Sequence, residues 1–219
     1  MAVLGFTARD DGYVARVDAT ERDVLLDVVD QVVELLGGPE VADPGPFRLG
    51  GARVDPPTDP AVRRLLPDAS RSDPEVAAEF RRLTEPDLRA TKVTNLLRLR
   101  AVLADAAPAL VVSAAAAPGI AAALTDVRLV LADRLGVRTD ADAAALDGAV
   151  AVALAALEEG GDPDTEVGEA PLPDQVIFVA SVYQILGMLQ DDLVELMLEG
   201  LPDTGGPDPS PSAPLGSQP

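Results

Sequence analysis

The hydrophobic positions of this chain recur mostly at helical spacing. From Thr20 to Leu36, valine and leucine occupy every third or fourth position until Gly37-Gly38-Pro39 interrupts the pattern. This spacing predicts an amphipathic helix that ends at the glycine pair. Thr20, with Asp23 three residues later, resembles a capping box at the start of the helix.

Short segments near the N-terminus have the character of strands. Residues 3–8 and 13–17 flank Asp10-Asp11-Gly12, a turn sequence whose glycine can adopt a positive φ. This arrangement predicts a short β-hairpin. Leu110-Val111-Val112 is also short and β-branched, and Ser113 after it can cap a helix, so this segment is a candidate third strand.

Two Asp-Pro pairs predict helix starts, because aspartate caps a helix N-terminus and proline suits the first helical position. They are Asp59-Pro60 and Asp73-Pro74. Thr84, with Asp87 three residues later, predicts the start of a further helix. The three predicted helices span residues 60–66, 74–83 and 85–104.

The second half of the chain carries three more helical patterns. The first has an apolar stripe and ends at Gly136, which suits a helix C-terminus. Thr139 or Asp140 caps an alanine-rich helix, and Asp174 behind Pro173 caps the last one. These helices are predicted over residues 117–135, 140–158 and 174–199, and the core-facing stripe of the last comprises Phe178, Val182, Ile185, Leu189 and Leu193.

Together these elements predict a mainly α-helical fold. We expect one helical domain over residues 1–199, with a small N-terminal β-hairpin and a possible third short strand packed on it. Residues 200–219 contain six prolines among glycine, serine and aspartate, with few large apolar side chains. Such a composition is typical of a disordered tail.

The composition excludes most familiar catalytic chemistry. Among 219 residues there is no cysteine and no histidine, which removes disulfides, thiolate metal sites and the commonest general base. No glycine-rich phosphate-binding motif occurs. The run Asp162-x-Asp164-x-Glu166 has the spacing of the first calcium-loop ligands, but Val167 stands where glycine is needed, so a solvated acidic loop is favoured. We expect no enzymatic activity, no cofactor and no metal.

The net charge of −20, from 17 basic and 37 acidic residues, opposes binding to nucleic acid and anionic lipid. Residues 60–100 are the exception, with nine basic and six acidic residues. An anionic partner would have to dock there. The N-terminus lacks a cationic leader, and no apolar run reaches the roughly 18 residues of a membrane span. We therefore expect a cytoplasmic protein.

Lys92, the only lysine, lies on the apolar stripe of the predicted helix over residues 85–104. The stripe comprises Leu88, Lys92, Leu96, Leu99 and Leu103, and Arg89 and Arg100 border it. Lys92 has two possible roles: it contacts an anion or a partner, or it is structural. In the structural role it either forms an internal ion pair, with Asp126 as the preferred partner, or it buries its stem while its ammonium reaches water. We favour the structural role, because a buried charge must be paired. Arg81 and Arg82 lie outside the stripe and are expected on the surface.

Several blocks of the sequence resemble an actinobacterial family of domains of unknown function. They occupy residues 64–69, 73–84, 88–93, 125–137, 182–186 and 189–194, and include Thr125-Asp126-Val127-Arg128. The family is named for AosR, an oxidative-stress transcriptional regulator, and its members are often encoded beside the Clp protease adaptor. The resemblance covers about residues 3–198 and implies regulation through a transcription partner. Because this chain has no cysteine, a thiol-based sensing step is not implied for it.

We therefore expect a non-enzymatic regulator that acts through a protein partner from the transcription or proteolysis machinery. Two alternatives are a DNA-binding regulator that uses residues 60–100 and an accessory factor of the Clp proteolytic system. A DNA-binding regulator should present a continuous basic surface to the duplex. Because six acidic residues interrupt the nine basic ones, direct DNA binding is the less favoured alternative.

Overall fold

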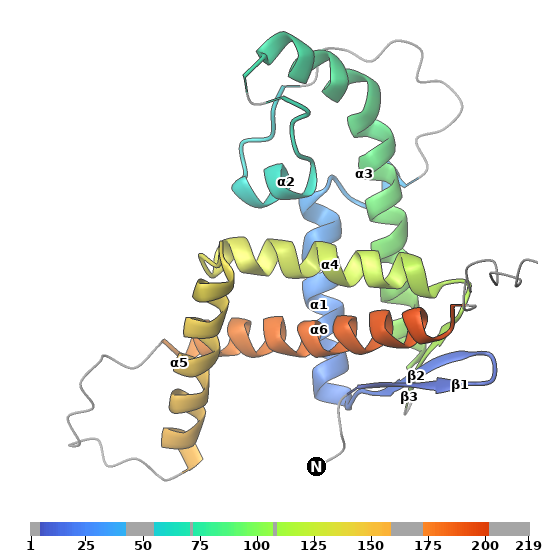
Figure 1. Ribbon diagram of the computed structural model, residues 1–219, viewed down its shortest axis with the longest axis vertical. Helices are drawn as coiled ribbons and strands as arrows, with labels where there is room; N and C mark the ends of the chain where they lie inside the picture. Colours follow the sequence, from blue (N-terminus) through green and yellow to red (C-terminus); the bar gives the residue numbers. More distant parts are fainter. Residues whose placement is uncertain (1–4, 43–54, 71, 107–108, 159–172, 202–219) are drawn as a thin grey trace, which may run out of the picture.

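The computed structural model describes residues 5–42, 55–70, 72–106, 109–158 and 173–201. It confirms a mainly helical fold with an N-terminal hairpin and a third strand (Figure 1). The predicted disordered tail falls largely on residues 202–219, and the predicted acidic loop on residues 159–172, both outside the described residues. The elements are β1 (Phe6–Arg9), β2 (Gly12–Arg16), α1 (Ala19–Leu35), the 3-10 helix η1 (Pro39–Val41), α2 (Pro60–Leu65), α3 (Pro74–Asp105), β3 (Ala109–Ser113), α4 (Ala117–Arg134), α5 (Asp140–Glu158) and α6 (Asp174–Glu199).

The three strands form one antiparallel sheet in the order β1-β2-β3. Its central strand pairs Ala15 with Phe6 on one side and with Leu110 on the other, and all three side chains are buried. Gly12 lies so close to β3 that a Cβ atom there would clash with the backbone carbonyl of Val112. The third strand therefore needs a glycine at this position of the hairpin.

The main helices form two crossing pairs. Helices α1 and α3 run side by side, and α4 and α6 run across them (Figure 1). Arginines tie α1 and α3 together in opposite directions: Arg22 of α1 donates to the carbonyl of Ala106 after α3, and Arg89 of α3 donates to the carbonyl of Leu36 after α1. Each contact places a cation at a helix C-terminus, where the helix dipole favours it.

Helix α4 lies at the centre of the packing. It contacts α1, α2, α3, α6 and β3, and only a few of its side chains reach solvent. Many of the buried residues are alanines, whose small side chains allow neighbouring helices to approach closely. The buried positions of α4 are Ala117, Ile120, Ala121, Ala123, Leu124, Asp126, Val127, Val130, Leu131 and Ala132.

Two predicted helix starts are wrong. Helix α1 begins two residues earlier than the Thr20 box implies, because Asp18 and Glu21 form the capping box instead. The break predicted at Thr84 is absent, and α3 continues through Pro86. The Thr84 hydroxyl donates to the carbonyl of Phe80 within the helix instead of capping a new one. Helix α3 changes direction along its length (Figure 1), as expected of a helix with an internal proline.

The core-facing stripe predicted for α6 is only partly right. Val182, Leu189 and Leu193 are buried and Ile185 is partly buried against the core, whereas Phe178 is 52% exposed and Leu186 is a further buried residue. The fully buried side of α6 begins at Ala180, and in the turns before it Val176, Ile177 and Val179 are only half-buried.

The close approach at Gly12 generates a stability prediction. Gly12→Ala should lower the free energy of unfolding by more than about 1 kcal/mol, because the added Cβ meets backbone and glycine's φ of 155° is unfavourable for alanine. Gly148→Ala is the matched control: it lies within α5 with open space around its Cα, and alanine should stabilise the helix by about 0.5–1 kcal/mol. Urea unfolding followed by circular dichroism measures both, and equal effects would contradict the prediction.

Candidate functional site

Lys92 and Asp126 form the ion pair that the sequence favours. Lys92 Nζ on α3 lies 2.6 Å from Asp126 Oδ1 on α4, and the two side chains are only 18% and 5% exposed. Burial raises the pKa of Asp126, and the ammonium of Lys92 partly offsets this increase. The second oxygen, Asp126 Oδ2, has no hydrogen-bond partner within the described residues. The pair therefore links two core helices, and its side chains are largely withdrawn from solvent.

Arg81 is buried, contrary to the surface position expected for it. Its guanidinium pairs with Asp68, in the segment after α2, and with Glu85 one turn along α3. Glu85 is also buried and accepts a 2.6 Å hydrogen bond from Arg89. The sequence signal for this cluster was the spacing of Arg81, Glu85 and Arg89, which places all three on one side of a helix. Helical phase alone did not show that the segment containing Asp68 covers that side.

The remaining predicted site residues form separate pairs. Arg82 Nη2 lies 2.6 Å from Glu79 Oε1 on the surface of α3, as expected for an exposed arginine. Arg100 Nε lies 2.6 Å from Asp30 Oδ1 of α1. The six candidates therefore divide among four local pairs or clusters that face different neighbours. Leu88 at the start of the predicted stripe is 37% exposed, so the stripe reaches the core only further along the helix.

The described basic side chains of the locally basic segment have partners within the molecule, although several of them lie at its surface. Beyond the ion pairs, Arg63 donates to the carbonyl of Pro57, Arg64 to that of Val137, and Arg98 to the side-chain oxygen of Asn95. Each of the eight basic residues that the structure describes between positions 60 and 100 has an intramolecular partner, while Arg71 lies outside the described residues. The positive charges of this segment are therefore engaged within the fold, and Lys92 and Arg81 are the ones that are largely buried.

An exposed apolar stripe on α3 was missed by the sequence analysis. Val76, Phe80 and Leu83, at positions i, i+4 and i+7 of the helix, are between 44 and 58% exposed. Arg89 marks the end of α1, so the turns of α3 before it extend roughly 20 Å beyond that helix at the standard rise per residue. We call Val76, Phe80 and Leu83 the α3 stripe.

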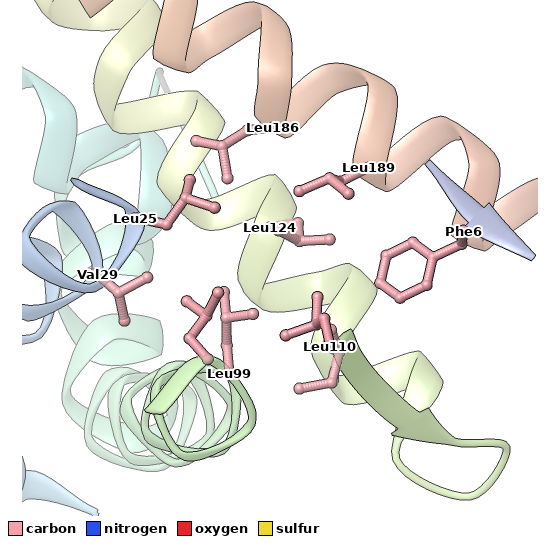
Figure 2. A pocket seen from close by; sticks show the side chains of 10 residues that line it. Phe6, Leu25, Val29, Leu99, Leu110, Leu124, Leu186 and Leu189 are labelled. Atoms are coloured by element: carbon pink, nitrogen blue, oxygen red, sulfur yellow. The ribbon is translucent and has the colours of Figure 1, made fainter. Parts of the chain in front are cut away.

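The interior of the domain holds a small void. Its volume is about 10 Å³, and ten apolar side chains from the sheet and four helices surround it, including Phe6, Leu25 and Leu124 (Figure 2). A void of this size holds at most a single water molecule, and its apolar lining offers that water no hydrogen bond. It is a packing defect of the core and has no capacity for a substrate.

Helix α6 is long and apolar enough to cross a membrane by composition, with a mean hydropathy of 1.3. Its buried face instead packs along α4 and includes Leu186, Leu189 and Leu193. Arg128 of α4 also lies against α6, where it donates to Gln190 and stacks 5.2 Å from the ring centre of Tyr183. Gly187 leaves room for the guanidinium. One face of α6 thus packs on α4, and 33% of its most apolar window is buried.

The fold defines a small α-helical domain with a three-stranded sheet, in which most described basic side chains are paired internally. The chain belongs to a family of domains of unknown function, DUF2017, whose model matches residues 3–197. No curated protein and no solved structure matches the chain.

The buried pair generates a prediction for Lys92. Lys92→Met should lower the free energy of unfolding by about 3 kcal/mol, because Asp126 would be left buried without its cation. The double variant Lys92→Met/Asp126→Leu should recover most of this loss, since it removes both charges. Arg82→Met, which breaks the surface pair with Glu79, should change the stability little. A Lys92→Met variant as stable as Arg82→Met would show that the pair is not structural.

The raised pKa of Asp126 predicts a pH dependence. Between the ordinary pKa of 3.8 and the raised pKa, the folded chain retains the Asp126 proton more than the unfolded chain does, and above the raised pKa the carboxylate pairs with Lys92. The stability contributed by this group should therefore decrease as the pH rises through the raised pKa. The double variant Lys92→Met/Asp126→Leu lacks the Asp126 carboxyl group. Its free energy of unfolding relative to that of the wild type should therefore increase over the same pH range. Urea unfolding from about pH 4 to 7 tests this, and a constant difference would contradict it.

Proposed function

We propose that this protein is a non-enzymatic cytoplasmic regulator that acts through protein–protein contacts. The observation that carries the proposal is the α3 stripe, an exposed row of large apolar side chains on a part of α3 that extends beyond α1. Large apolar side chains gathered on one exposed helix face are typical of protein-interaction sites.

The AosR-like attribution makes the proposal more specific. The resemblance implies an oxidative-stress transcriptional regulator with a partner in the transcription machinery. In this chain the Asp126 and Arg128 of the resembling block both serve packing, one toward α3 and the other toward α6. That block therefore supports a shared fold, and the exposed α3 stripe supplies the surface through which a partner would act.

Direct DNA binding is the weaker alternative. Binding to phosphates needs lysine and arginine side chains that are free to face the duplex. The described basic residues between positions 60 and 100 already have intramolecular partners, and the chain carries a net charge of −20.

The charge distribution predicts weak binding to DNA. The purified full-length protein should bind random duplex DNA only weakly and with a shallow dependence on salt, because few phosphates would be neutralised. Fluorescence anisotropy with a labelled duplex across a salt series measures this. Submicromolar affinity at physiological salt would favour the DNA-binding alternative.

The α3 stripe predicts which variant loses the partner. Phe80→Ser/Leu83→Ser should abolish recovery of a transcription protein from native lysate in an affinity pull-down analysed by mass spectrometry. Because both side chains are exposed, the melting temperature should stay close to that of the wild type. Phe178→Ser/Val152→Ser is the matched control, since it removes two equally exposed apolar side chains from α6 and α5. If both double variants recover the same proteins as wild type, the α3 stripe is not the binding surface.

A further inference from the structure

We propose that the C-terminal half of α6 binds a basic amphipathic helix of a partner protein. The surface in question comprises Asp191, Val194, Glu195, Leu198, Glu199 and Leu201, and we call it the α6 face. It is distinct from the α3 stripe: α6 ends beside the sheet, whereas the first turns of α3 lie at the far end of the molecule (Figure 1). The proposal therefore goes beyond the function proposed above.

The α6 face combines an apolar row with an acidic row. Val194 and Leu198 are four residues apart on α6, Leu201 lies just beyond its end, and the two leucines are 61 and 64% exposed. Asp191 and Glu195, four residues apart, begin the neighbouring row on the same side of the helix. An open surface depression lies among Asp191, Val194, Glu195 and Leu198, which all belong to this one helix. Two parallel rows of this kind match a helix that has one apolar stripe and flanking charges.

The acidic row is almost free of internal partners. Arg128 Nη1 approaches Asp191 Oδ1 only to 3.9 Å. Among the residues that the structure describes, no basic side chain pairs with Glu195 or Glu199. This differs from α3, where the acidic residues Glu79 and Glu85 are paired with arginine. The carboxylates of the α6 face are therefore available to lysine or arginine from another molecule.

The negative charge of the α6 face favours a positively charged partner. Residues 101–219 carry three basic and nineteen acidic residues, so the field around α6 attracts cations and repels nucleic acid and anionic lipid. The residues that follow α6, from 202 to 219, contain two aspartates and no lysine or arginine. That segment of the chain therefore carries no cation for the acidic row, and a basic helix from a partner would supply one.

A synthetic peptide pair tests the proposal on the full-length protein. The probe is a labelled peptide of about 18 residues, long enough to form a helix, made of leucine, alanine and lysine. Its leucines lie at i, i+4 and i+7, and its lysines flank them. The second peptide has the same composition but distributes the leucines around the helix. Fluorescence anisotropy at physiological salt should show binding of the amphipathic peptide at least about tenfold tighter than of the permuted one.

Two variants of the α6 face separate its apolar and acidic rows. Leu198→Ser/Leu201→Ser and Glu195→Gln/Glu199→Gln should each weaken binding of the amphipathic peptide about tenfold. All four side chains are exposed, so the fold should be retained, which circular dichroism verifies. The Glu variant should also reduce the salt dependence of binding.

Matched controls distinguish a defined surface from general attraction to an acidic protein. Asp87→Asn/Asp105→Asn removes the same charge from exposed positions on α3, and Phe178→Ser/Val152→Ser removes two exposed apolar side chains. Both should leave peptide affinity within about twofold of wild type. The proposal is overturned if the control variants weaken binding as much as the α6 variants, or if both peptides bind equally. Because the α3 stripe is intact in every variant, these outcomes do not depend on the function proposed above.

Discussion

The burial of helix α4 is the constraint on which the rest of the structure depends. Five other elements pack against it, and its alanines let α3 and α6 approach closely from different sides. A helix covered in this way cannot hold an unpaired charge, so Asp126 requires Lys92 from α3. Arg128 extends from the same helix onto α6, where Gly187 leaves space for it. Asp126 and Arg128 thereby link α4 to its two longest neighbours, α3 and α6.

The chain has too few basic residues to pair with all of its acidic residues, which makes its surface strongly acidic. Only 17 basic residues serve a chain with 37 acidic ones, and several are used at helix C-termini. Arg22, Arg89 and Arg64 donate to carbonyl groups that follow α3, α1 and α4. These contacts satisfy groups that a helix leaves without partners and place positive charge where the helix dipole favours it. The carboxylates that remain unpaired face solvent, and on α6 they lie beside exposed leucines.

The candidate site was predictable where burial followed from helical spacing. Lys92 shares an arc with Leu96, Leu99 and Leu103, and such an arc must face other helices, so a carboxylate partner could be expected. Arg81 carried no comparable signal. It is buried because the segment containing Asp68 lies against α3, a contact between residues that no periodic pattern connects. The α3 stripe was not predicted for the opposite reason. Val76, Phe80 and Leu83 have the spacing of core residues, but no described element covers them.

The sequence by itself determined the helical class, the hairpin, most helix ends and the pairing of Lys92. These features depend on interactions within a few residues, or on an apolar spacing that allows only one buried side. The tertiary structure decided whether α3 would continue through Pro86, which turns of α3 and α6 would extend beyond the core, and which charges would be covered. Each of these depends on packing against segments that are distant in the sequence. Packing can compensate for the backbone hydrogen bond that Pro86 cannot form, and it determines how far a neighbouring helix covers α3 or α6.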